Sequence, residues 1–185
     1  EVIKAAVAAA KECGKLVLLG QTPTYPETGF GYIAMGLEEM QSSGMPFHNV
    51  ARFIEKPSLS GAEALLESGG VLWNGGMFVW TIDALRTAIE THMPSTAKAV
   101  AALEAGADVA SVWQQLQATS VDYGILEHHM EELLVVPCDF GWSDLGSWPA
   151  VAPLMNQTSL GSSDVSDALS IDGGGHIVYA PEKLV

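Results

Sequence analysis

Short apolar runs alternate with amphipathic stretches along most of this chain. An unbroken apolar run indicates a buried strand, whereas apolar residues spaced three or four apart indicate a helix with one buried face. The runs that predict strands are KLVLLG at 15–20, FHNVARFI at 47–54, VLWNGGMFVW at 71–80 and ELLVVPC at 132–138. The stretches that predict helices are 1–13, 58–68, 81–93, about 95–105, about 107–117, 120–129 and 147–155. This alternation predicts an α/β fold, in which helices flank a sheet.

Glycine, proline and serine mark the breaks between these elements. Segment 21–31, QTPTYPETGFG, contains two prolines and two glycines and is predicted to be an irregular loop. Ser58 or Ser60 is predicted to cap the N-terminus of the helix that follows, and the Gly69–Gly70 pair to end it. Thr81 is predicted to open the next helix.

The character of the sequence changes near residue 156. NQTSLGSSDVSDALS, at 156–170, is small and polar and is typical of a linker, whereas IDGGGHIVYAPEKLV, at 171–185, resembles the first strands of another β unit. We therefore predict one domain over 1–155, followed over 156–185 by a linker and the start of a β domain. Because Glu1 lies within a helical pattern, we expect the chain to be a piece of a longer protein.

Charge and composition exclude several partners. The net charge of −14 argues against nucleic acid and anionic membranes, and no apolar run is long enough to span a bilayer. The two cysteines, Cys13 and Cys138, lie far apart and suggest no disulfide framework, which favours a reducing cytoplasm, and no secretory signal is recognisable. With only eight lysines and arginines, any phosphate site must depend on few of them, on backbone N–H groups or on metal.

The segment FIEKPS places a carboxylate and an ammonium group directly after a predicted strand. Strand ends in open α/β sheets are where ligands bind. Glu55 could accept hydrogen bonds from sugar hydroxyls, and Lys56 could offer a point charge to a phosphate, so the pair suits a sugar phosphate. The alternative is a solvated turn with an ordinary charge pair.

Three further segments offer polar groups beside a permissive backbone. In WNGGMFVW, Asn74 has both a donor and an acceptor, and Gly75 lets the backbone approach a ligand; the alternative is a strand bulge. In TPTYPETGFGYI, Gly31 could do the same, or the segment is only a stiff surface loop. In SVDYGILEH, Asp122 could line a pocket or cap a helix, and Tyr123 could be a core aromatic.

The segment GWSDLGSW places one carboxylate, Asp144, between two tryptophans and two glycines. Mg²⁺ at a phosphate takes one or two carboxylates together with phosphate oxygens and water, so packed tryptophans could fix such a ligand. The alternative is that Asp144 caps the helix that begins near Ser147. Histidines add little to this picture, because the adjacent His128 and His129 point apart on a helix and make a poor metal pair.

Taken in order, five segments resemble one family closely: PTYPETGFGYI, FIEKP, WNGGMFVW, SVDYGILEH and GWSDLGSW. They resemble the second half of the catalytic domain of mannose-1-phosphate guanylyltransferases, which are sugar nucleotidyltransferases. The resemblance covers residues 1–155, and it implies a Rossmann-like mixed sheet with flanking helices. The tail resembles the start of the C-terminal extension of these proteins.

The resemblance also implies a role for each candidate residue. Glu55 would hold sugar hydroxyls and Lys56 the phosphate, with Lys56 and Asp144 counted as catalytic. The remaining contacts to the mannose pocket would come from Gly31, Asn74, Gly75 and Asp122. Asp144 would be one of two aspartates that hold Mg²⁺.

The implied reaction transfers GMP from GTP to mannose 1-phosphate and gives GDP-mannose and pyrophosphate in the cytoplasm. The family's glycine-rich basic loop, which cradles the nucleotide, has no match in this sequence. We therefore expect the chain to be inactive without an N-terminal half. Sequence leaves two alternative functions open: a related enzyme for glucose or heptose phosphate, and a non-catalytic subunit that senses sugar nucleotides. It also leaves the formation of a homo-oligomer open.

Overall fold

The computed structural model describes residues 1–146, 148–157, 163–164 and 175–179. Two compact units are present, Glu1–Phe140 and Gly141–Val185. The predicted division into domains at 1–155 and 156–185 stays a prediction.

Five strands form the sheet of the first unit, every residue of which the structure describes: β1 (Leu16–Gln21), β2 (Gly31–Ser42), β3 (Met45–Ile54), β4 (Val71–Val79) and β5 (Leu133–Cys138). Their order is β1-β4-β2-β3-β5, and β5 pairs back with β1, so the hydrogen-bonded ladder closes on itself. The β1–β5 pair is parallel and the other pairs are antiparallel. The predicted mixed sheet is confirmed, although no pattern in the sequence indicates that the ladder closes.

Strand β1 is buried along its whole length. Leu16 and Leu18 belong to one apolar cluster, whereas Val17 and Leu19 belong to another. Side chains alternate between the two faces of a strand, so β1 has a packed layer on each side. This double burial explains why the run KLVLLG has no polar interruption.

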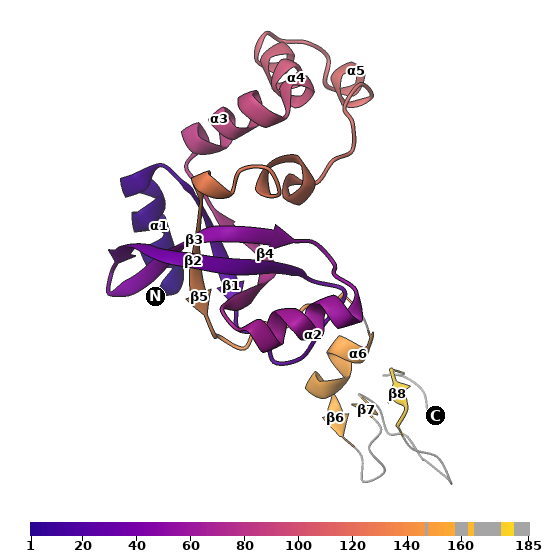
Figure 1. Ribbon diagram of the computed structural model, residues 1–185. Coiled ribbons are helices and arrows are strands. Elements are labelled where there is room, and N and C mark those ends of the chain that lie inside the picture. The colour runs from indigo at the N-terminus through magenta and orange to yellow at the C-terminus, as the bar shows by residue number, and fades with distance from the viewer. Residues whose placement is uncertain (147, 158–162, 165–174, 180–185) are drawn as a thin grey trace. The chain divides into compact units, whose positions relative to one another are not determined.

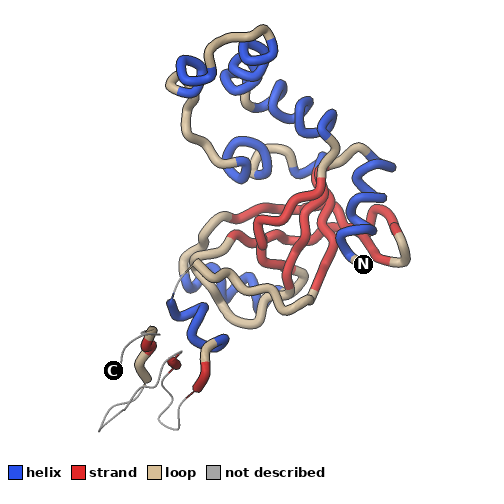
Figure 2. Tube along the Cα trace, turned by 180° about the vertical axis from the view of Figure 1, so that it is seen from behind, coloured by secondary structure: helices blue, strands red, loops and turns tan. Residues whose placement is uncertain are grey.

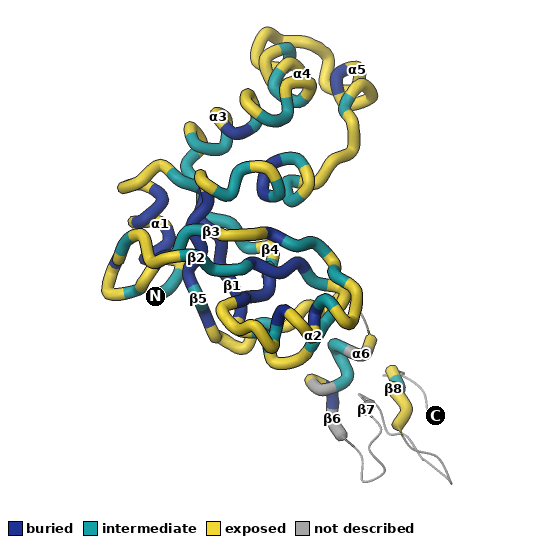
Figure 3. The backbone as a smooth tube through the Cα atoms, viewed as in Figure 1, coloured by how far each residue is buried: buried dark blue, intermediate teal, exposed yellow. Residues whose placement is uncertain are grey.

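Helices occupy most of the predicted positions in the first unit. They are α1 (Val2–Cys13), α2 (Leu59–Ser68), α3 (Ile82–His92), α4 (Pro94–Glu104) and α5 (Val109–Trp113). Both ribbon and tube place α3, α4 and α5 beyond one end of the strands (Figure 1 and Figure 2). The burial colouring shows β1 and β5 almost entirely buried, whereas α4 and α5 are mostly exposed (Figure 3).

Side-chain caps explain where two of these helices begin. The hydroxyl of Ser58 accepts a hydrogen bond from the Gly61 amide at 3.2 Å, so Ser58 and not Ser60 is the cap of α2. Thr81 accepts in the same way from the Ala84 amide at 3.1 Å and opens α3. Each cap satisfies an amide that has no partner within the helix.

The helix predicted over 120–129 takes a different form. The chain makes a π-helix, η1 (Asp122–Leu126), followed by a short 3₁₀ helix, η2 (Met130–Glu132). Short π-helical turns are rare and are found frequently at functional sites. The periodicity of apolar residues cannot distinguish one such turn from a turn of α-helix.

The second unit contains α6 (Trp148–Val151), a 3₁₀ turn η3 (Ala152–Leu154) and three short strands: β6 (Asn156–Gln157), β7 (Ser163–Asp164) and β8 (Ile177–Val178). Strand β7 pairs antiparallel with β6 and parallel with β8. The predicted helix after the GWSDLG turn is present in α6 and η3. Most of the predicted linker, and residues 180–185, lie outside the described residues.

Candidate active site

Glu55 and Lys56 lie where β3 ends and before α2 begins. The Lys56 ammonium is 3.2 Å from Glu55 Oε1, and the Lys56 side chain is 60% exposed whereas that of Glu55 is only 11% exposed. Lys56 also has a φ of 45°, a left-handed conformation that costs a non-glycine residue about 1–2 kcal/mol. The charge pair of the alternative interpretation therefore exists, but it sits on a strained backbone with a nearly buried carboxylate.

The surroundings of Lys56 favour its charged form. A hydrogen bond to Glu55 raises the pKa of the lysine above its ordinary 10.5, as do the charge of Glu55 and, to a smaller extent, those of Tyr123 and Asp122. Lys56 is therefore an ammonium ion at neutral pH. An exposed ammonium beside a fixed carboxylate matches the predicted division of work between phosphate and hydroxyl groups.

Gly31 opens β2 and pairs in register with Asn74 of β4. A Cβ placed on Gly31 would lie 2.6 Å from Glu55 Oε2 and 3.2 Å from Asn74 Cβ. Only glycine fits here, because the carboxylate and the asparagine side chain both crowd this backbone position. Three predicted site residues from three strands or strand ends are thus in contact.

The amide of Asn74 is held at both of its polar atoms. Nδ2 donates to Asp122 Oδ1 at 2.9 Å, and Oδ1 accepts from the Gly76 amide at 3.1 Å. The pairing of β1 with β4 shifts register between Leu18 and Gly20, so the strand is irregular here, as the alternative interpretation of this segment expects. Gly75 follows Asn74 within the same strand.

Asp122 reaches this cluster from η1. It lies inside the π-helix, and its carboxylate accepts from Asn74, so the interpretation of Asp122 as a helix cap is wrong. At the start of this turn, the Ser120 hydroxyl accepts a hydrogen bond from the Tyr123 amide at 3.4 Å. Tyr123 is half exposed, so it is not the core aromatic of the alternative interpretation.

Aromatic residues that the sequence did not single out hold the neighbouring loop. The rings of Tyr25 and Phe30 meet Trp73 edge to face, with centroids 4.9 and 5.3 Å apart. The Tyr32 hydroxyl donates to the Glu27 carbonyl at 2.9 Å. Loop 22–30 is therefore anchored on the residue that precedes Asn74 and is not a free surface loop.

Asp144 lies in the second unit on an exposed turn. Its Oδ1 accepts from the Gly146 amide at 3.0 Å. Of the two tryptophans predicted to enclose this carboxylate, Trp148 is 57% exposed, and its ring centroid lies 6.0 Å from that of Tyr179. The enclosure of Asp144 by tryptophans stays a prediction. The proposed cap partner Ser147 lies outside the described residues.

Comparison with known proteins identifies the family. The family model described as nucleotidyl transferase matches residues 1–159. The chain belongs to the nucleotidyl transferase family. The resemblance predicted from the order of motifs is confirmed at this level.

The nucleotidyl transferase relatives include several with mannose in their names. The chain is 41% identical over 157 residues to a mannose-1-phosphate guanylyltransferase of Sinorhizobium fredii, covering 80% of this chain and 30% of the relative. It is 34% identical over 182 residues to a mannose-1-phosphate guanylyltransferase of Escherichia coli, covering 94% and 38%. The chain thus spans about a third of the length of these curated relatives.

A solved structure supports the fold. The crystal structure of a Thermus thermophilus protein, described as a mannose-1-phosphate geranyltransferase, superposes with a TM-score of 0.86 at 33% identity. The superposition covers 99% of this chain and 53% of that one. In the described part of the chain, no helix is long and apolar enough to cross a membrane.

Proposed function

We propose that this chain carries the sugar-phosphate side of an enzyme that transfers GMP from GTP to mannose 1-phosphate. The observation that carries the proposal is the contact of Glu55, Gly31, Asn74 and Asp122 at one end of the sheet, with Lys56 beside them. The names of the relatives support the choice of mannose and guanine.

Each polar group in this cluster has a distinct task. Glu55 Oε2 and the Asn74 amide would meet hydroxyl groups of the sugar ring, and Gly31 would let the ring approach the backbone. The Lys56 ammonium, which is mostly exposed and is paired with Glu55, would also pair with the phosphate. Asp122 would line the pocket and hold the orientation of Asn74 through their hydrogen bond.

Catalysis of this reaction would depend more on positioning the two reactants than on proton transfer. An oxygen of the sugar phosphate forms a bond to the α-phosphorus of GTP. The bond between the α-phosphorus and the oxygen that bridges the α- and β-phosphates breaks. Pyrophosphate leaves with the electron pair and GDP-mannose remains. The attacking phosphate is already anionic, so no general base is needed, and alignment together with neutralised charge would supply the rate.

A divalent cation, Mg²⁺ by the nature of the donors, would neutralise phosphate charge in this reaction. Asp144 fits as one of its ligands, because it is an exposed carboxylate whose Oδ1 is fixed by the Gly146 amide while its charge faces solvent. A second carboxylate and the basic loop for GTP would come from residues outside this chain. Two facts support this division: the chain spans about a third of its relatives, and it has only eight basic residues.

Steady-state kinetics of the full-length protein would test the proposal. With GTP and a divalent cation, we expect mannose 1-phosphate to be converted with a higher kcat/KM than glucose 1-phosphate or a heptose phosphate. A preference for another sugar phosphate would overturn the choice of mannose. If no sugar phosphate were turned over, the proposal of an enzyme would be overturned, and a subunit that senses sugar nucleotides would be favoured. The 185-residue chain alone is expected to be inactive.

A further inference from the structure

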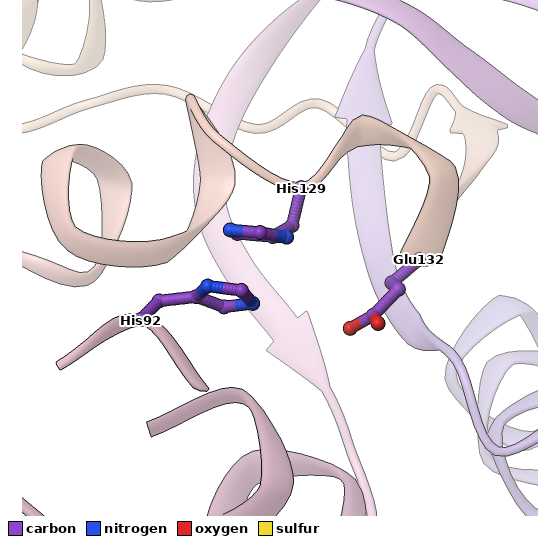
Figure 4. Close-up of side chains that lie close together, drawn as sticks. All are labelled: His92, His129 and Glu132. Carbon is purple, nitrogen blue, oxygen red and sulfur yellow. The ribbon is translucent and has the colours of Figure 1, made fainter. Parts of the chain in front are cut away.

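Three side chains with metal-binding groups converge away from the proposed sugar pocket. His92 is the last residue of α3, His129 directly precedes η2, and Glu132 is the last residue of η2. One ligand atom of each lies within 4.8 Å of the others. Figure 4 shows the two imidazole rings face to face, with the Glu132 carboxylate directed toward them.

This cluster leaves a buried polar atom without a partner. In the described part of the chain, His92 Nε2 is buried and makes no hydrogen bond. A buried nitrogen of this kind costs about 1–3 kcal/mol when nothing pairs with it. The unpaired His92 Nε2 therefore lowers the stability of the fold, and a ligand bound to this nitrogen would restore that stability.

We propose that His92, His129 and Glu132 bind a divalent transition-metal ion, with Zn²⁺ as the ion of choice. Two imidazoles and one carboxylate form a donor set that Zn²⁺ accepts, with water completing a tetrahedron. Mg²⁺ prefers oxygen ligands and so would not compete well for this site. The inference does not rest on the function proposed above.

Binding would require a local rearrangement. The two rings stack with an interplanar angle of 17°, so one ion cannot lie in the planes of both rings. For both nitrogens to meet one ion, the rings must rotate apart about their side-chain bonds. Glu132 is exposed, so its carboxylate is free to close the site.

The ion would join two elements that bear on the proposed sugar pocket. A Cβ placed on Gly124 of η1 would lie 2.8 Å from Met93 Sδ, so the end of α3 already packs closely against η1. His92 is adjacent to this contact, and His129 lies three residues after the end of η1. A metal bridge would therefore fasten α3 to the turn that carries Asp122.

Competition with a chromophoric zinc indicator would test the site. The full-length protein, stripped of metal and kept in excess Mg²⁺ to occupy oxygen sites, would be titrated with Zn²⁺. The variants are Glu132→Gln, His129→Ala and, as a matched control, His128→Ala, which removes the exposed neighbouring imidazole. Circular dichroism would verify that each variant is folded.

The proposal expects one Zn²⁺ per chain to be removed from the indicator by the wild type and by His128→Ala. Glu132→Gln and His129→Ala should lose at least about tenfold in affinity, because even outer partners of metal ligands are worth roughly 10–100-fold. Glu132→Gln is an isosteric change at an exposed residue, so this variant should fold. Its zinc affinity therefore still tests the site if His129→Ala fails to fold. Unchanged affinity in either folded variant, or no zinc uptake by the wild type, would overturn the proposal.

Discussion

The side-chain amide of Asn74 donates a hydrogen bond to the carboxylate of Asp122, 2.9 Å away and 48 residues later in the chain. This bond joins strand β4 to the π-helix η1. The Asn74 side-chain oxygen, Oδ1, accepts a second hydrogen bond from the Gly76 amide. Together the two hydrogen bonds fix the orientation of the Asn74 side-chain amide. Any ligand at this position meets an amide whose orientation is already set.

Asp122→Ala should therefore weaken use of the sugar phosphate. The Asn74 amide would lose its partner and its fixed orientation, and we expect the KM for mannose 1-phosphate to rise about tenfold, equivalent to roughly 1.4 kcal/mol. Steady-state kinetics of the full-length enzyme measures this, with Asp83→Asn, a change at an exposed carboxylate, as control. An unchanged KM would show that the bond has no part in sugar binding.

Gly31→Ala should damage the site more than the fold. The added methyl would displace the Glu55 carboxylate, which lies 2.6 Å from its position. Crowding of this kind costs about 1–3 kcal/mol of stability, and kcat/KM should fall by at least about tenfold. Gly29→Ala is the control, because its methyl would meet only the flexible end of Glu27. Equal kinetics for both variants would argue against the assignment of Gly31.

Lys56→Gly should separate stability from activity. Glycine adopts a φ of 45° without strain, so thermal stability should stay equal or rise by about 1 kcal/mol. Loss of the ammonium should raise the KM for mannose 1-phosphate. Lys56→Ala, which keeps the strain and loses the charge, is the matched variant. If sugar-phosphate use survived both substitutions, Lys56 would not be the phosphate contact.

Asp144→Asn should lower turnover by orders of magnitude when Mg²⁺ is limiting. Asparagine keeps an oxygen that can accept from the Gly146 amide, so the turn itself should persist. What it loses is the negative charge that a hard cation requires. Turnover would be compared with wild type across a Mg²⁺ titration. Identical curves would remove Asp144 from the metal site.

The two cysteines should react very differently with thiol reagents. Cys13 is exposed and Cys138 is buried, and both are free. Burial raises the pKa of Cys138 to about 11, so at pH 8 one thiol should be modified in the folded chain and two after denaturation. The unfolded chain loses this proton first, so Cys138 should also lower stability as the pH rises from 9 toward 11. Modification of both thiols in the folded chain would contradict the burial of β5.

Local patterns in the sequence predicted the elements well. Apolar runs located β1, β3, β4 and β5, and serine and threonine marked the starts of α2 and α3 because capping is a local interaction. Gly31, Glu55, Asn74 and Asp122 could be singled out because their segments combine polar side chains with permissive backbone. Their contacts were beyond reach, since these depend on pairing between distant strands.

Two features could not be predicted from the sequence, for related reasons. Along the chain His129 is next to His128, whereas in the structure its ring stacks on that of His92 at the end of α3. Trp73, which anchors the loop through Tyr25 and Phe30, looked like one more apolar residue of a strand. In both cases the partner lies dozens of residues away, where periodicity carries no information.

Strand β1 has one layer packed on each of its faces. Helix α1 contributes to one layer and α3 to the other, so the six residues of β1 lie between the two layers. The first unit should consequently melt in one step rather than shedding its outer helices in turn. We then expect a substitution in the buried face of α1, which touches none of the proposed ligands, to alter the proposed sugar site as well.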